Sequence, residues 1–216
     1  MPKLLSIGVM AVVGFMASSF VMFSQPSGMG AGDALVDVLV WGADLKIDLG
    51  LYSPPVRAEL EKYLQRSKAY RSKRAKPAAS DVWALVYAAE VRYERKLAAL
   101  SDDPQAPALA AAYVASLRPC YEWEGYHDCP ESEATFAAEY QAAHPGGPFR
   151  EYLPLLAAHR WLCAAEGYEY EKQQDGATRC RRAYKQAIAT AQRSPALLIR
   201  SAAEGLSARG GCLSQH

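Results

Sequence analysis

The most hydrophobic part of the chain is an uncharged run near its N-terminus. Residues 4–23 contain no charged side chain, and Lys3 is the only one ahead of them. Twenty residues at the helical rise span about 30 Å, the thickness of a bilayer's hydrocarbon core. Secretory signals usually have a shorter apolar stretch and a small-residue cleavage site, which residues 28–32 match only in part. We therefore expect residues 1–24 to be a membrane anchor, with a cleaved signal segment as the alternative.

The next stretch, residues 25–52, has no single period. Residues 24–33 are rich in Gly, Ser and Pro, which is typical of a flexible link. Leu45, Ile47, Leu49 and Leu51 alternate with polar residues or glycine as in a strand, whereas residues 34–41 fit a helix. We favour helix because no later segment offers a partner strand. Residues 25–52 are thus interpreted as a linker with a short ambiguous segment.

From Ser53 onward, apolar residues recur at spacings of three and four, as on one face of a helix. Ser53–Pro54 and Ser194–Pro195 are typical helix starts, and Gly210 is a typical helix end. The expected helices cover about residues 53–76, 80–101, 104–117, 130–143, 149–173, 177–192 and 195–208. Short connections favour antiparallel neighbours. We predict an all-α fold over residues 53–216, an antiparallel bundle or array of helical hairpins with about six to eight helices.

One pair of predicted helices carries a recognisable pattern. Trp161, Ala165 and Tyr168 fall on one helix, Cys180, Tyr184 and Ala187 fall on the next at matching spacings, and Pro195 follows. Residues 158–195 thereby resemble a single tetratricopeptide repeat, in which small residues let two helices approach while aromatic residues fill the remaining space. The connection is about three residues longer than that repeat has, and we find no second copy. An ordinary helical hairpin is the alternative.

Composition and charge narrow the function classes. Half of the residues are hydrophobic, 22% are charged and the formal net charge is +1. This composition is typical of a globular protein. We expect no nucleic-acid partner, because no strong positive field is present. Six cations do gather between Arg66 and Lys76. This cluster fits a solvated helix end whose dipole favours positive charge, or a contact with anionic lipid or a partner protein.

Five cysteines follow the leader, which suits an oxidising compartment. Cys120 and Cys129 bracket a short loop that a disulfide closes easily. Cys180 and Cys212 fall at the same end of the last two predicted helices, where their Cα atoms can approach the roughly 5–6 Å that a disulfide needs. We therefore predict Cys120–Cys129 and Cys180–Cys212 disulfides, with Cys163 as a buried thiol.

The densest polar and aromatic cluster lies in residues 120–129. Four of its residues have side chains that can bind a metal or transfer a proton, namely Glu122, Glu124, His127 and Asp128. They alternate with aromatic residues, which are typical of interfaces, and we assign partner binding to Tyr121, Trp123, Tyr126 and His127. A purely structural loop and a metal or catalytic site are the alternatives, although no zinc-ligand spacing is present.

No other segment has a catalytic pattern. His159 precedes Cys163 by one helical turn, and we expect a core histidine rather than the base of a nucleophilic thiol. Nucleophile-elbow, phosphate-loop and haem-attachment motifs are not found. We therefore assign no catalytic, cofactor or metal residues.

These observations predict an exported protein anchored through residues 4–23, with its helical domain in the periplasm or another extracytoplasmic space. If the leader is cleaved, the domain is a soluble secreted one. We expect an accessory or scaffolding protein that contacts other envelope or membrane proteins. The alternatives are a periplasmic inhibitor or immunity-type binding protein and an enzyme that uses the acidic loop 120–129.

Overall fold

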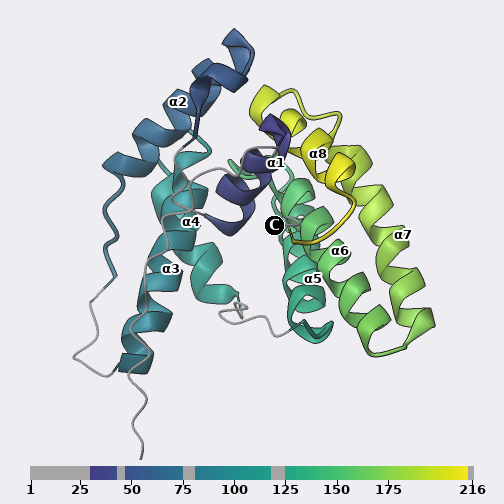
Figure 1. Cartoon of the computed structure of the whole chain (residues 1–216). Helices are drawn as coiled ribbons and strands as arrows, with labels where there is room; N and C mark the ends of the chain where they lie inside the picture. The colour runs from purple at the N-terminus through teal and green to yellow at the C-terminus, as the bar shows by residue number, and fades with distance from the viewer. Residues whose placement is uncertain (1–29, 43–46, 75–80, 118–124, 214–216) are drawn as a thin grey trace, which may run out of the picture.

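The fold is entirely helical in the residues that the computed structural model describes, which are 30–42, 47–74, 81–117 and 125–213. This part of the chain contains eight α-helices and no strand (Figure 1), so the predicted all-α class is confirmed. The helices are α1 (Ala31–Val36), α2 (Pro54–Ala69), α3 (Asp81–Ala99), α4 (Ala106–Ser116), α5 (Asp128–Ala143), α6 (Leu153–Tyr170), α7 (Gln174–Ala191) and α8 (Leu197–Arg209). A π-helical segment, η1 (Asp37–Trp41), continues α1, and a 3-10 turn, η2 (Leu49–Leu51), precedes α2.

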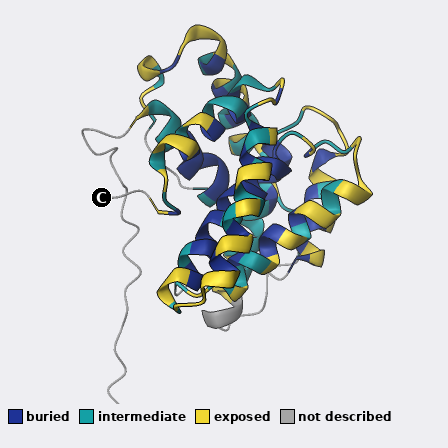
Figure 2. Ribbon diagram, turned by 90° about the vertical axis from the view of Figure 1, so that its right-hand side faces the viewer, coloured by how far each residue is buried: buried dark blue, intermediate teal, exposed yellow. Residues whose placement is uncertain are grey.

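The helices pack around α6. Fourteen of its eighteen residues are buried, so it has neighbours on almost every side. Helices α5, α6 and α7 lie side by side, α1 packs against α8, and α3 packs against α4 (Figure 1). Buried residues face the inside of the array and exposed residues cover its outside (Figure 2).

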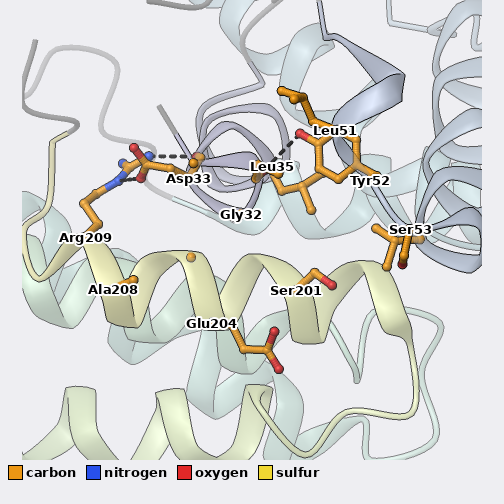
Figure 3. A pocket seen from close by; sticks show the side chains of 14 residues that line it. Gly32, Asp33, Leu35, Leu51, Tyr52, Ser53, Ser201, Glu204, Ala208 and Arg209 are labelled. Carbon is orange, nitrogen blue, oxygen red and sulfur yellow. Dashed lines mark hydrogen bonds and ion pairs between the residues drawn. The ribbon is translucent and has the colours of Figure 1, made fainter. Parts of the chain in front are cut away.

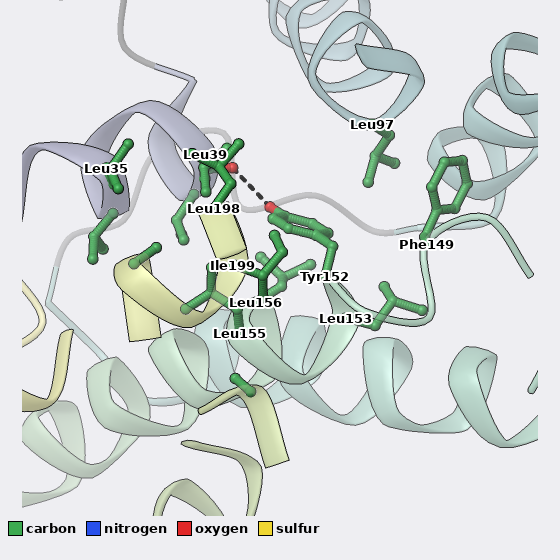
Figure 4. Close-up of a cluster of buried hydrophobic side chains, with 14 of the residues drawn as sticks. Leu35, Leu39, Leu97, Phe149, Tyr152, Leu153, Leu155, Leu156, Leu198 and Ile199 are labelled. Atoms are coloured by element: carbon green, nitrogen blue, oxygen red, sulfur yellow. Dashed lines mark hydrogen bonds between the residues drawn. The ribbon is translucent and has the colours of Figure 1, made fainter. Parts of the chain in front are cut away.

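The centre of the core is built from large aliphatic and aromatic side chains around the start of α6 (Figure 4). Leu155, Leu156 and Phe149 are almost completely buried there. Tyr152 is buried too, and its hydroxyl donates a hydrogen bond of 2.9 Å to the carbonyl oxygen of Leu39 in η1. Burying a side chain of this size contributes roughly 1.5–3 kcal/mol, and the hydrogen bond satisfies the one polar group involved.

The helical body begins at Ala31, earlier than the expected boundary at residue 53. Leu35 and Leu39 are fully buried in the main core. A Cβ added to Gly32 would lie 2.8 Å from the Cα of Gly205, so the backbones of α1 and α8 touch. Residues that the sequence assigned to a linker are therefore part of the core. The strand-like alternation ends in the 3-10 turn η2, and residues 43–46 lie outside the described residues.

The N-terminus of α8 is capped by a distant side chain. The predicted helix start at Ser194–Pro195 is wrong by two residues, because α8 begins at Leu197. The carboxylate of Glu59 on α2 accepts hydrogen bonds from the Leu197 and Leu198 amides, at 3.4 and 2.9 Å. A carboxylate at this position satisfies free amides and favours the helix dipole. Gly210, with φ of 68°, ends α8 as predicted.

The basic cluster near the end of α2 makes several contacts within the protein. Helix α2 ends at Ala69, before the expected end at Pro77. Arg66 donates a hydrogen bond of 2.7 Å to the carbonyl oxygen of Ala99. Arg74 pairs with Glu90 and with the buried carboxylate of Glu94. These two arginines therefore join α2 and the segment that follows it to α3.

Helices α6 and α7 form the hairpin expected from the repeat-like pattern. The turn between them spans residues 171–173, and Ala165, Tyr168 and Cys180 pack together between the two helices. This arrangement suits both the tetratricopeptide-like reading and an ordinary hairpin. No helix within the described ranges is long and apolar enough to cross a bilayer. The expected anchor, residues 1–24, lies outside those ranges.

We predict that Gly205→Ala lowers the free energy of unfolding by about 1–3 kcal/mol, because the added methyl group would meet the Gly32 backbone and push α1 from α8. Urea denaturation followed by circular dichroism measures this loss. Gly146→Ala is the matched control, because no atom lies within 4 Å of the position of its Cβ. Equal stability of the two variants would contradict the close packing of α1 on α8.

Candidate functional site

The predicted binding loop is described from Gly125 onward. Tyr121, Glu122, Trp123 and Glu124 lie outside the described residues. Gly125 has φ of 90°, a conformation that favours glycine. Tyr126 follows it with 48% of its surface exposed, and Asp128 begins α5. The described end of the loop therefore presents one large aromatic side chain to solvent.

The backbone of this loop rests directly on α6. A Cβ added to Gly167 would lie 2.6 Å from the amide nitrogen of His127, so only glycine permits this approach. The His127 ring lies parallel to Tyr168 with centroids 3.8 Å apart, and its Nδ1 lies 2.6 Å from a carboxylate oxygen of Glu171. The hydrogen bond from His127 lowers the pKa of the Glu171 carboxyl. His127 thus holds the loop against α6 and against the turn that connects α6 to α7.

Tyr126 meets a second exposed aromatic residue at the end of α6. Tyr170 is 73% exposed, and the two rings meet edge to face with centroids 6.2 Å apart. The described residues include five exposed large hydrophobic side chains, Leu51, Leu85, Tyr126, Tyr170 and Leu213. Two of these five are in ring contact, and we call this pair the Tyr126–Tyr170 surface.

Ion pairs fix the helices beneath this surface. The Tyr168 hydroxyl donates to Glu131 of α5 at 2.6 Å, and Arg179 of α7 reaches the same carboxylate at 2.6 Å. Arg181 forms a two-pronged pair with Glu169, at 2.7 and 2.9 Å. Such surface pairs contribute little stability individually, but two-pronged pairs set a defined geometry. The Tyr126–Tyr170 surface consequently lies on a well-supported meeting point of α5, α6 and α7.

The cysteines pair differently from the prediction. Cys163 and Cys212 form a disulfide with a Cα–Cα distance of 4.8 Å, and Cys180 is a buried free thiol. The predicted Cys180–Cys212 bridge is therefore wrong. After Gly210 the chain crosses α6 rather than α7. There the backbone amide of Cys212 donates a hydrogen bond to Glu166, and the backbone carbonyl oxygen of Cys212 accepts one from His159. A disulfide does involve Cys129, as predicted, and Cys120 lies outside the described residues.

These pairings leave little thiol chemistry. Burial raises the pKa of the Cys180 thiol to about 11, so it remains a protonated core group. His159, Cys163 and Cys212 are the one group of potential metal ligands close together in the described residues. Both sulfur atoms are bonded to each other, which leaves no thiolate for a metal. Burial and the neighbouring Arg160 lower the pKa of His159 well below its usual range, so it is a neutral core histidine as expected.

A cavity of about 570 Å³ lies between α1, η2 and α8 (Figure 3). Arg209 extends toward Asp33 in Figure 3 and forms an ion pair with it. It forms a second ion pair with Asp37. The Tyr52 hydroxyl donates to the carbonyl oxygen of Ala31 at 2.9 Å. These polar groups already bind other groups of the protein. The cavity is therefore a weaker candidate for a ligand site than its volume alone would indicate.

Comparison of the chain with protein-family models, with curated proteins and with solved structures finds no match to any of them.

Sequence reasoning named Tyr126 but missed Tyr170. Tyr170 is the last residue of the mostly buried helix α6. Its place as an aromatic residue just before a polar turn was the signal in the sequence that could have identified it. Its contact with Tyr126 joins residues 44 positions apart, which periodicity does not reveal. The sequence also gave no role to Gly167, whose importance depends on the loop that lies over it.

We predict that peptide mapping without reduction finds Cys163 linked to Cys212, while Cys180 reacts with alkylating reagents only after unfolding. The disulfide spans 49 residues, so Cys163→Ser with Cys212→Ser should cost about 4 kcal/mol of stability in the chain-entropy account. Cys180→Ala is the control and should lose much less. A linked Cys180–Cys212 peptide would overturn the pairing.

Proposed function

We propose that the protein is a helical accessory subunit that binds another protein through the Tyr126–Tyr170 surface. The observation that carries this proposal is the ring contact between two exposed tyrosines, Tyr170 at the end of α6 and Tyr126 in a loop that rests on Gly167 and is held by the stacking of His127 on Tyr168. Tyrosine is enriched among the residues that dominate binding energy at protein interfaces. Tyrosines that are already positioned lose less entropy on binding than mobile ones.

We also propose that this subunit works outside the cytoplasm, anchored through residues 4–23. A buried disulfide between Cys163 and Cys212 and a disulfide at Cys129 support export, because disulfides persist mainly in oxidising compartments. The uncharged leader supports a membrane anchor. The partner would then be another protein of the envelope or membrane.

We expect Tyr126→Ser with Tyr170→Ser to abolish capture of the partner from detergent-solubilised membranes. In titrations with the purified partner, each substitution should weaken binding about 30-fold, which corresponds to roughly 2 kcal/mol. Leu85→Ser is the matched control, because Leu85 is 62% exposed on α3, away from the surface. The proposal fails if the double variant binds as well as wild type, or if Leu85→Ser is equally defective.

Gly167→Ala tests whether the positioning of the tyrosines matters. The added methyl group would lie 2.6 Å from the His127 amide nitrogen and should displace the loop while keeping both tyrosines. We expect partner binding to weaken at least tenfold, with the helical content unchanged by circular dichroism. Wild-type affinity in this variant would show that the pair binds without its support. Gly146→Ala again serves as the matched glycine control.

A further inference from the structure

A separate polar cavity lies beside Arg160 of α6 and shares no lining residue with the Tyr126–Tyr170 surface. It has a volume of about 170 Å³ and lies between η1, α3, α4, α5 and α6. Its apolar wall includes Val40, Trp41, Ala89 and Val114. Tyr93, Lys96, Glu133 and Arg160 supply polar groups from three different helices. Ligand sites commonly combine apolar walls with a few convergent polar groups in this way.

Lys96 is the most unusual residue of this cavity. Only 3% of its surface is exposed, and its ammonium lies 3.9 Å from the centroid of the Tyr93 ring. Its Nζ donates one hydrogen bond, of 2.7 Å, to the carbonyl oxygen of Val40. It forms no ion pair with any carboxylate of the described residues. A buried ammonium without a counter-charge is costly, since it has lost its hydration.

The carboxylates of the cavity are already neutralised by arginines. Glu133 pairs with Arg160, whose guanidinium also lies 4.5 Å from the Trp41 ring. Glu90 pairs with Arg74 at 2.9 Å. Lys96 therefore has no carboxylate paired with it, and Glu133 favours its ammonium form only through a longer-range interaction. Burial and the nearby Arg160 lower the pKa of the Lys96 ammonium well below its usual range, which expresses the same cost.

A neighbouring cavity of about 250 Å³ reinforces this charge. It shares Gly42, Arg92 and Lys96 with the first and adds Lys68 and Arg95 to its lining. None of the described residues that line it is acidic. Lys96 thus lies between two cavities, and all charged residues that line the second one are positive, which favours entry of an anion from that side.

A further donor is available beside Lys96. The hydroxyl groups of Tyr93 and Tyr113 are both buried and interact with each other, and neither has another hydrogen-bond partner in the described part of the chain, so one of their two donors is left over. Buried hydroxyl groups without a partner are uncommon, and each calls for an unseen acceptor or a functional role. An acceptor with negative charge would satisfy Tyr93 and Lys96 together.

We propose that this cavity binds a small organic carboxylate, with the carboxylate on Lys96 and Tyr93 and the apolar body against Trp41, Val40 and Val114. The ammonium supplies a charge-assisted hydrogen bond, and the apolar wall distinguishes such a ligand from a bare inorganic anion. Arg160 and Glu133 hold the far wall of the cavity in place. This site is independent of the partner-binding surface, and neither proposal requires the other.

Benzoate is a suitable probe, because it joins a carboxylate to a flat apolar body. In isothermal titration calorimetry with the full chain in detergent, we expect one benzoate to bind per protein. Benzamide has the same shape without the charge and should bind at least tenfold more weakly. Inorganic phosphate should not compete with benzoate at equal concentration.

Lys96→Met should weaken benzoate binding at least tenfold, and Tyr93→Phe severalfold. Replacing a buried unpaired ammonium by an apolar side chain should leave the melting temperature unchanged or higher, so loss of binding would not reflect unfolding. Lys185→Met makes the same chemical change at an exposed position on α7 and should bind benzoate like wild type.

Three results would overturn the proposal. They are no saturable benzoate binding to the wild-type protein in the millimolar range, equal affinity for benzamide, and unchanged affinity in a folded Lys96→Met variant. Competition by inorganic phosphate as strong as that by benzoate itself would also overturn it, because the apolar wall would then have no part in recognition.

Discussion

A buried ion pair between Arg160 and Glu133 fixes the packing at the centre of the protein. Arg160 lies on the most buried helix, α6, and removing one partner of such a pair typically costs about 3–5 kcal/mol. The pair joins α6 to α5, and the Arg160 guanidinium also covers the Trp41 ring, which joins both helices to η1. Two consecutive helices and η1, which lies far from them in the sequence, are thereby fixed around one charged group. The interior is shaped as much by this requirement as by apolar packing.

Helix α6 connects the interior to the proposed binding surface. Its first turns carry the core and Arg160, its middle carries the Cys163 disulfide, and its last turn ends at the exposed Tyr170. Gly167 lies between these regions and lets the loop with Tyr126 rest on the helix. Neither the exposed tyrosine pair nor the buried ammonium of Lys96 is what stability alone would favour. A group that lowers stability and has no structural role is most readily explained by a role in binding.

The sequence anticipated part of the candidate site. Aromatic residues in a short loop between helices pointed to Tyr126 and His127, but the structure gives them different roles, one exposed and one anchoring the loop. Lys96 was missed because lysine on an amphipathic helix is normally counted with the solvated face. Its position three residues after Tyr93, on the face that packs inward, was the available signal. Whether that position is buried depends on η1, which covers it.

Helix periodicity and helix-end signals act within a few residues, so the all-α class and the approximate extents of the later helices can be predicted from the sequence. Which side chains meet is set by the packing of distant segments. Cys212 pairs with Cys163 because the chain crosses α6 after Gly210, and Glu59 caps α8 from another helix. The segment after Gly30 enters the core for a similar reason, since α8 offers a glycine where α1 needs close contact. Such contacts join residues many positions apart, and no local pattern specifies them.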